Sequence, residues 1–526
     1  MMIRTRLGEA AAAARFLSGL RPFLGRRVDP DTARERLRAS MARREQAFAL
    51  LLRRGVFERE HGPWRALFAW AGIDFDDVRK LLAAHGLEGT LERLHDAGVF
   101  LSLEEFKGLR PIERPGFSLP VSAEDFDNPL SARQYEARTG GSSGASRRVM
   151  AGLDLLEHEC AYHALFYAAH GAADRPLGLW LPAPPGAVGI KNALMRSKLG
   201  QRVDAWFSQS RVDDAPFRHR LFADATFRVA GLAGAALPRP SYVPASEAGR
   251  IAAWLAEWCA RGRAPVFLST PSAAVRTCAA AEASGLDVAG TLFVLVGEPF
   301  TAGKKRAIEA AGCEAATHYA MVEAGMIGLA CRNGAAPDDV HLVRDKIATI
   351  QKPRTAPGGQ SLPALLHTTL LTSTPKLMFN VESGDYGVVE ERDCGCGVLP
   401  AEFGRHLHTI RSYEKLTSEG MHFMGPDLLT LLEQTLPGRF GGYPTDYQLV
   451  EAEREGLPVV RLLVSPSVGD VDDREVVETT LSFLRSRGIG PTLMAEVWEN
   501  GSTLEVVRAQ PHVTGAGKIQ PLQREV

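Results

Sequence analysis

The middle of the chain alternates short apolar runs with longer stretches in which apolar residues recur every three or four positions. The runs Leu177–Leu181, Val266–Leu268 and Leu292–Val296 have the length and composition of buried strands. Helical spacing marks residues 153–170 and 251–258. Strands that alternate with helices predict a parallel α/β fold, in which ligands bind at the carboxyl ends of the strands.

The two ends of the chain have different patterns of apolar and polar residues. Residues 31–98 carry charged and apolar residues at helical spacing, whereas prolines break residues 108–138 into an extended linker. Beyond Arg411 the pattern predicts strands at 459–464, 493–497 and 504–507, with a helix near 475–484. We therefore expect three parts: a helical N-terminal segment (1–100), a large multi-layer α/β core (101–411) and a small α+β C-terminal domain (412–526).

Bulk properties exclude several kinds of partner. The 526 residues carry a net charge of −1, which gives no reason to expect nucleic acid. The seven cysteines, an odd number, suit a reducing compartment, so we expect a cytoplasmic protein. No apolar run is long enough for stable membrane insertion. The basic, alanine-rich segment Met1–Arg27 is expected to be a helix packed by one face, with a membrane-surface helix as the less favoured alternative.

A glycine- and serine-rich loop follows the linker. It reads Thr139, Gly140, Gly141, Ser142, Ser143, Gly144. Glycines let a backbone approach a ligand closely, and successive backbone N–H groups can hold an anion. The two serines add hydroxyl donors, and Arg147 and Arg148 add charge. By composition alone a flexible linker explains this loop equally well.

Four further motifs follow in order along the chain. They are Gly297-Glu298-Pro299, Tyr319-Ala320-Met321-Val322-Glu323, Glu382-Ser383-Gly384-Asp385 followed by Arg411, and Thr514-Gly515-Ala516-Gly517-Lys518-Ile519. Each alone has an ordinary explanation: a turn, a core tyrosine, a hairpin tip or a loose tail. The evidence for a shared function lies in the order and the spacing of the motifs along the chain.

In that order the motifs resemble the adenylate-forming superfamily, and within it the phenylacetate–CoA ligase branch. The resemblance covers about Gly98 to the C-terminus. It implies a large adenylation domain in the core and a small, mobile C-terminal domain that carries a catalytic lysine. It also implies ATP, Mg²⁺ and a small carboxylic acid as reactants, with coenzyme A as co-substrate.

The resemblance also implies a role for each matching residue. The loop from Thr139 to Gly144 would grip the β- and γ-phosphates, and Gly297-Glu298-Pro299 with Tyr319 and Ala320 would lie against adenine. Glu323 would bind Mg²⁺, Asp385 would accept hydrogen bonds from the ribose, and Arg411 would precede the domain hinge. Lys518 would place its charge between the carboxylate and the α-phosphate. Glu323, Arg411 and Lys518 are thus the candidate catalytic residues.

Three positions depart from the family pattern. Ala145 stands where the loop usually has lysine, Ala320 replaces a glycine, and Tyr413 falls where a polar hinge residue is common. Two alternatives stay open: adenylation with transfer to an amine or a carrier-protein thiol, and a nucleotide-binding relative without catalysis. The retained Lys518, Glu323 and Asp385 favour catalysis.

Four residues form a candidate zinc set: Cys331, His341, Cys394 and Cys396. Three thiolates and one imidazole suit a tetrahedral structural zinc ion. Some relatives in the resembled branch carry a similar arrangement. Reduced thiols near a hairpin, without metal, are the alternative.

The sequence says less about which carboxylic acid is the substrate and about the oligomeric state. Small and apolar residues at Ala324–Gly328, after the tyrosine motif, indicate an apolar aromatic or aliphatic acid. The N-terminal segment is longer than the resemblance requires. It is a candidate contact with a partner or with a second subunit in a homodimer.

Overall fold

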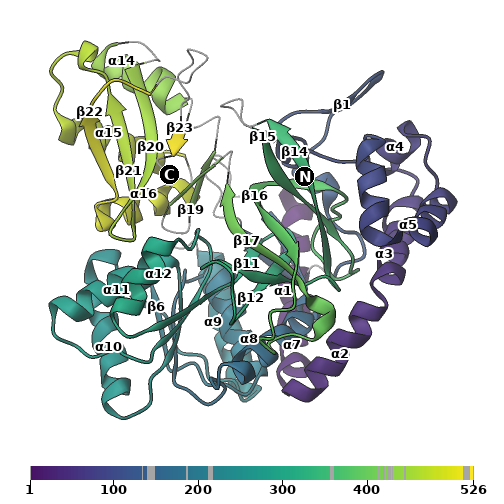
Figure 1. The fold of residues 1–526 in the computed structure, drawn as a ribbon, viewed down its shortest axis with the longest axis horizontal. Coiled ribbons are helices and arrows are strands. Elements are labelled where there is room, and N and C mark those ends of the chain that lie inside the picture. Colours follow the sequence, from purple (N-terminus) through teal and green to yellow (C-terminus); the bar gives the residue numbers. More distant parts are fainter. Residues whose placement is uncertain are drawn as a thin grey trace.

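The computed structural model describes most of the chain. The described residues are 2–132, 134–138, 148–184, 187–210, 217–355, 361–412, 415–418, 421–424, 428, 430–442, 446–487, 489–512 and 522–524. The structure is mixed α/β, which confirms the predicted fold class (Figure 1). No helix among these residues is long and apolar enough to cross a membrane.

A parallel sheet of six strands forms the lower part of the molecule in Figure 1. Its order is β10 (Glu314–Thr317), β9 (Leu292–Leu295), β8 (Val266–Ser269), β5 (Leu177–Trp180), β6 (Ala205–Ser208) and β7 (Ser241–Tyr242). The helices of this region are α7 (Leu153–Ala169), α8 (Ala187–Lys198), α9 (Phe217–Leu232), α10 (Ala248–Ala260), α11 (Pro271–Ala283) and α12 (Ala302–Ala310). The three strands predicted from apolar runs are β5, β8 and β9, and every residue of these strands is buried.

Threonines start the helices that follow two of these strands. The side chain of Thr270 accepts a hydrogen bond from the Ala273 backbone N–H, and Pro271 occupies the first helical position of α11. Thr301 caps α12 in the same way, because its side chain accepts a hydrogen bond from the Lys304 backbone N–H. Both caps fix the chain near the carboxyl ends of β8 and β9.

A second sheet of seven antiparallel strands lies beside the first. Its order is β11 (Tyr319–Met321), β12 (Gly325–Ala330), β13 (Val340–Leu342), β17 (Arg405–Ser412), β16 (Val381–Glu391), β15 (Ser361–Thr369) and β14 (Ile347–Thr355). Strand β11 follows β10 after a single residue, so the two sheets meet at the tyrosine motif.

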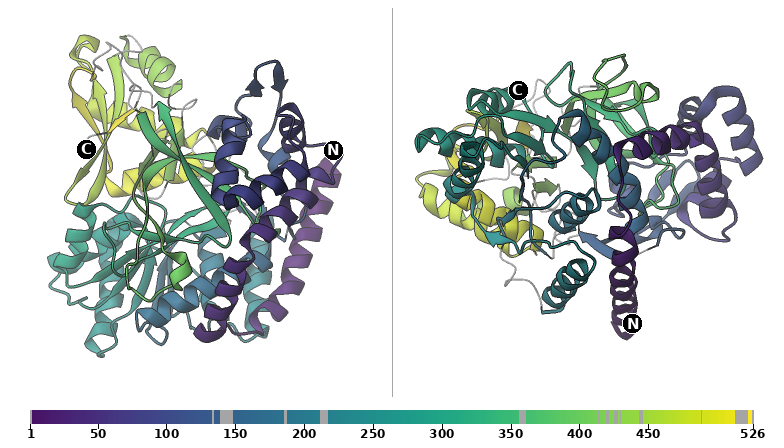
Figure 2. Two further views of the ribbon diagram at one scale, coloured as in Figure 1. Left: turned by 45° about the vertical axis from the view of Figure 1, so that its right-hand side comes forward. Right: turned by 90° about the horizontal axis from the view of Figure 1, so that it is seen from below.

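The N-terminal helices pack onto these sheets as part of one hydrophobic core. They are α1 (Met2–Leu24), α2 (Pro30–Ala42), α3 (Arg44–Leu52), α4 (Pro63–Trp70), α5 (Phe75–Asp96) and α6 (Leu103–Phe106), followed by the hairpin β1 (Ile112–Arg114) and β2 (Phe117–Leu119). Figure 2 shows them gathered along one side of the molecule. Helix α1 buries Phe16, Leu20 and Phe23 against this core, which is the packing by one face that the sequence predicts.

The C-terminal part has a separate core. Its sheet runs β22 (Leu504–Arg508), β21 (Leu457–Val464), β20 (Tyr447–Arg454) and β23 (Leu522–Arg524), with helices α14 (Leu436–Phe440), α15 (Asp473–Arg485) and α16 (Ile489–Gly501). The strand expected at 493–497 is wrong, because these residues lie in α16. Met494, Val497 and Trp498 all bury into the core from one helix face. The hairpins β3 (Tyr135–Arg138) with β4 (Arg148–Ala151) and β18 (Lys415–Ser418) with β19 (Met421–Met424) complete the structure.

Candidate active site and metal centre

The junction of the two large sheets brings two of the sequence motifs together. Tyr319 begins β11, and Asp385 lies in β16. The Tyr319 hydroxyl donates a hydrogen bond of 2.7 Å to Asp385 Oδ2. Asp385 is buried, and its backbone N–H donates to Ser383 Oγ at 3.2 Å. An aromatic ring and a carboxylate, 66 residues apart in sequence, are thus held at one place.

Arg411 lies on the strand next to Asp385. In the pairing of β16 with β17, Asp385 stands opposite Ser412, and Tyr386 stands opposite Arg411. The Arg411 side chain donates to Asp338 Oδ2 at 2.8 Å and keeps 28% of its surface exposed. Asp338 also accepts the backbone N–H groups of Thr409 and Ile410, each at 2.8 Å. One carboxylate therefore fixes both the arginine and the backbone before it.

Glu298 is turned away from this junction and into the protein. Its side chain is 1% exposed and accepts hydrogen bonds from the hydroxyl and the backbone N–H of Ser272, at the start of α11. Lys304 Nζ lies 3.3 Å from the same oxygen. The Gly297-Glu298-Pro299 turn is therefore anchored to two helices, and Gly297, with a φ of 90°, is its exposed corner.

Glu323 is half-buried in the turn between β11 and β12. The residues just after Glu323 are held by Glu159, a buried glutamate on α7. Glu159 accepts the Met326 backbone N–H at 2.7 Å and pairs with Lys346 at 3.0 Å and with Lys191 at 2.7 Å. Gly325 leaves room for this carboxylate, because a Cβ there would lie 2.0 Å from Glu159 Oε1.

Electrostatics keep this group ionised. Burial opposes the charged form of Glu159, but Lys191 and Lys346 together hold the pKa of its carboxyl well below the usual value. Lys346 also donates to the Ala324 carbonyl at 2.7 Å. Sequence reasoning missed Glu159, Lys191 and Lys346. The available signal was an acid that falls among the buried positions of the helix Leu153–Ala169, whereas its other acids, Asp154 and Glu157, do not.

Several predicted site residues lie outside the described part of the chain. They are the loop from Thr139 to Gly144 with Ala145, Tyr413, and Lys518. Of the residues that the structure does describe, Asp385 and Arg411 lie on the paired strands β16 and β17, and Tyr319 on β11 reaches Asp385 through its hydroxyl. Glu323 follows Tyr319 in the next turn, and the Glu298 carboxylate points elsewhere.

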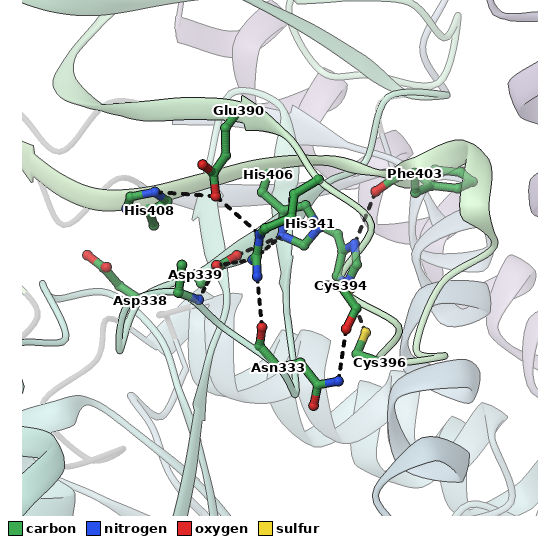
Figure 3. Close-up of polar contacts among 12 residues, drawn as sticks. Asn333, Asp338, Asp339, His341, Glu390, Cys394, Cys396, Phe403, His406 and His408 are labelled. Atoms are coloured by element: carbon green, nitrogen blue, oxygen red, sulfur yellow. Dashed lines mark hydrogen bonds and ion pairs between the residues drawn. The ribbon is translucent and has the colours of Figure 1, made fainter.

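The predicted zinc residues form one cluster. Cys331 follows β12, His341 lies in β13, and Cys394 and Cys396 lie in the loop after β16. One ligand atom from each lies within 4.8 Å of all the others. His341 Nε2 is 3.1 Å from Cys396 Sγ and 3.7 Å from Cys394 Sγ (Figure 3).

The histidine of this cluster is oriented as a metal ligand would be. Its Nδ1 is 3.0 Å from the Phe403 carbonyl oxygen, which requires an Nδ1–H donor. The Nε2 lone pair therefore faces the thiols. Val398 donates its backbone N–H to Cys396 Sγ at 3.4 Å, a contact that stabilises a thiolate.

A second layer of charges surrounds the cluster. Asp339 Oδ1 is 2.8 Å from His406 Nδ1, and its other oxygen accepts a hydrogen bond from Arg392. Burial raises the pKa of Asp339, but the hydrogen bond to His406 and the Arg392 charge bring it below the usual value. Figure 3 shows this network beside the cysteines. The donor set and its support fit a closed tetrahedral zinc site.

Comparison with known proteins gives likeness of fold alone. No protein-family model and no curated protein sequence matches the chain. Among solved structures the chain is similar to 2-hydroxyisobutyryl-CoA ligase in complex with 2-HIB-AMP and CoA, with 16% identity over 93% of this chain and 90% of that chain and a TM-score of 0.49. It is also similar to fatty acyl-adenylate ligases from E. coli and L. pneumophila, with 12% identity over 74% and 69% and a TM-score of 0.32.

A third similar structure is acetoacetyl-CoA synthetase from Streptomyces lividans, with 13% identity over 75% of this chain and 55% of that chain and a TM-score of 0.29. By their names, all three are ligases or synthetases. Since each TM-score is below 0.5, the functional proposal rests on the residues of this chain.

Proposed function

We propose that this chain is an ATP-dependent acid–thiol ligase of the adenylate-forming superfamily, phenylacetate–CoA ligase-like branch. The hydrogen bond between Tyr319 and Asp385, with Arg411 on the adjoining strand, carries the proposal. It joins two of the motifs at the junction of the two sheets. A buried carboxylate beside an aromatic ring is suited to a nucleoside, because the carboxylate accepts both ribose hydroxyls and the ring lies against the base.

In the first step a carboxylate oxygen of the substrate forms a bond to the α-phosphorus of ATP. The bond from that phosphorus to the β-bridging oxygen breaks, and pyrophosphate leaves with the electron pair. Glu323 would hold Mg²⁺, which neutralises charge on the phosphates when it is bound. Lys518 would stabilise the charge that develops between the two reacting groups.

In the second step the sulfur of coenzyme A attacks the acyl carbon. The bond from that carbon to the phosphate oxygen breaks, AMP leaves, and the thiol proton passes to solvent. The acid is expected to be small and apolar, because Ala324 to Gly328 offer only small and apolar side chains. An amine or a carrier-protein thiol is the alternative acceptor.

The loop at Thr139 would grip the β- and γ-phosphates with backbone N–H groups and the hydroxyls of Ser142 and Ser143. The Gly297–Pro299 turn would offer its backbone to adenine, because the Glu298 carboxylate is occupied by Ser272 and Lys304. Arg411, tied to Asp338, would set the start of the hinge to the C-terminal domain.

Pyrophosphate exchange into ATP tests the proposal. Purified protein is given labelled pyrophosphate, ATP and Mg²⁺ with a panel of aryl and aliphatic acids. Exchange that depends on one class of acid is expected, together with thioester formation when coenzyme A is added. Exchange without a thioester would place the acceptor elsewhere, and no exchange with any acid would contradict adenylation itself.

We also propose that Cys331, His341, Cys394 and Cys396 hold a structural zinc ion. The close approach of the four ligand atoms supports this, as does the orientation of His341 by the Phe403 carbonyl. All four positions would be filled by protein, which suits a structural site with no place for substrate. The ion would tie the loop after β16 to the strands β12 and β13.

A further inference from the structure

A group of buried polar side chains lies between helices α7 and α8 and the start of β11. His163 and Tyr167 come from α7, Arg196 from the last turn of α8, and His318 from the residue before Tyr319. Their exposed fractions are 3%, 1%, 0% and 5%, respectively. None of them has a part in the adenylation proposed above.

The charge of Arg196 has no carboxylate to balance it. Its guanidinium carbon lies 4.4 Å from the centre of the Tyr167 ring, and Nε, Nη1 and Nη2 have no hydrogen-bond partner among the described residues. No ion pair joins it to an acid in that part of the chain. Arginine stays protonated in proteins, and an unpaired buried charge is strongly unfavourable.

The neighbours of Arg196 add unused donors. His318 Nδ1 accepts the Ala330 backbone N–H at 3.2 Å, so the proton of a neutral ring must lie on Nε2. Within the described ranges, that Nε2–H and the Tyr167 hydroxyl are buried without a hydrogen-bond partner. Burial and the Arg196 charge lower the pKa of His318 to about 3, so the ring is neutral at pH 7. The rings of His163 and His318 are 5.5 Å apart, in edge contact.

Tyr167 is also part of the lining of a nearby hollow. The hollow has a volume of about 520 Å³ and lies at the amino-terminal ends of β5, β8 and β9. Arg175 and Arg263 also line it, with Asp174 as the one acid. The hollow lies opposite the carboxyl ends of these strands, where the candidate active site is. Two arginines and one acid give the lining of this hollow a positive balance of charge, which favours anions.

We propose that Arg196, Tyr167 and His318 form a buried binding site for a small monovalent anion. The guanidinium supplies the charge, and the hydroxyl and the imidazole N–H supply two further donors. Cation–π contact with Tyr167 orients the guanidinium but leaves its N–H groups without acceptors. A free halide has the size and the charge that such a site takes.

Thermal unfolding tests the site without reference to catalysis. The wild type, Arg196→Met and the control Arg202→Met are compared in chloride and in gluconate of equal ionic strength. The Arg202 side chain is 84% exposed, so its removal corrects for general charge effects. We expect the wild type and the control to melt several degrees higher as chloride rises, because a ligand bound only to the native state stabilises it. Arg196→Met should show no such rise.

Crystals of the wild type soaked in bromide give an independent measurement, which also serves if Arg196→Met does not fold. An anomalous peak in contact with the Arg196 nitrogens is expected. Melting that is the same in chloride and in gluconate, with no bromide at Arg196, would overturn the proposal. A failure of pyrophosphate exchange would not bear on the anion site, because neither the unfolding series nor the bromide crystals depend on catalysis.

Discussion

Asp338 accepts three hydrogen bonds from the strand that leads into the C-terminal part of the chain. They come from the backbone of Thr409 and Ile410 and from the Arg411 side chain. Thr409 has a φ of 55°, a left-handed conformation that is unusual for a threonine. Asp338 lies between Cys331 and His341 in sequence, so the proposed zinc centre and the proposed hinge share one loop.

The metal proposal makes a prediction for one residue. The purified wild type should contain about one equivalent of zinc per chain, and Cys394→Ser should lose most of it, because three ligands bind zinc far more weakly than four. Elemental analysis after gel filtration without chelator measures this. Cys259→Ser is the control, since the Cys259 thiol contacts Thr291 and Ala289. A wild-type protein without zinc would contradict the zinc proposal.

At the scale of single elements, the sequence predicts what local periodicity determines. The strands β5, β8 and β9 and the helices α7 and α10 appear where apolar spacing places them. The segment 493–497 was misread because a short apolar run cannot distinguish a strand from one buried helix face. The seven-stranded sheet could not be predicted, since the register of β16 on β17 depends on contacts between distant segments.

The candidate site likewise has residues that the sequence predicts and residues whose role depends on distant contacts. Tyr319, Asp385 and Arg411 are recognisable by motif, whereas the role of Glu298 depends on partners that no pattern identifies. Glu159 was missed because its partner Lys346 is 187 residues away.

The buried pair between α7 and the strand region predicts a stability effect. Lys346→Met should lower the free energy of unfolding by about 3–5 kcal/mol, because it leaves Glu159 with Lys191 alone and the Ala324 carbonyl without its donor. Urea unfolding measures this. Lys352→Met, which removes a lysine paired with the exposed Asp96, should cost less than about 1 kcal/mol. Equal effects would mean that the buried pair contributes no more than a surface pair.

Helix α5 is tied to helix α3 by an ion pair between Glu88 and Arg44, which predicts a pH dependence. Burial opposes the charged form of Glu88, but hydrogen bonds and charge from Arg44 lower the pKa of its carboxyl from 4.5 to about 2. Because the folded-state pKa is depressed, the stabilisation is complete above pH 4.5 and is lost as pH falls toward 2. The shift corresponds to about 3 kcal/mol.

Urea unfolding between pH 6 and pH 2 checks this dependence by comparing the wild type with Glu88→Gln. The difference between the two should disappear over the acidic part of that range. Glu92→Gln changes an exposed glutamate on the same helix and should follow the wild type throughout. A difference that persists at the lowest pH would show that Glu88 acts through packing and not through its charge.

At the scale of the whole molecule, the C-terminal part rests on the parallel-sheet region through a contact at α12. Thr301 Oγ1 donates to Glu453 Oε2 on β20 at 2.6 Å, and the adjacent Gly303 leaves room for that carboxylate. In the proposed reaction the C-terminal domain supplies Lys518 to the first step. The catalytic site is then complete only when both parts of the molecule contribute to it.

Lys518→Ala tests whether the C-terminal domain supplies the lysine that acts in the first step. Pyrophosphate exchange should fall about 100- to 1000-fold, as for loss of a group that stabilises transition-state charge. ATP affinity, measured by equilibrium binding, should change less than about two-fold. Transfer from a supplied acyl-adenylate to coenzyme A should continue at the wild-type rate. A parallel loss of ATP binding would mean that the lysine holds ground-state nucleotide and has no special part in the first step.

The shared core of the N-terminal helices limits where this chain can be shortened. The Phe379 ring packs against Phe48, Trp64 and Phe68, and Asn380 donates to the carbonyls of Leu91 and Val99. A protein started at residue 101 would present these apolar and polar groups to water together, and we expect it to aggregate on expression. Limited proteolysis of the intact chain should spare the same helices. They belong to the same folding unit as the two large sheets.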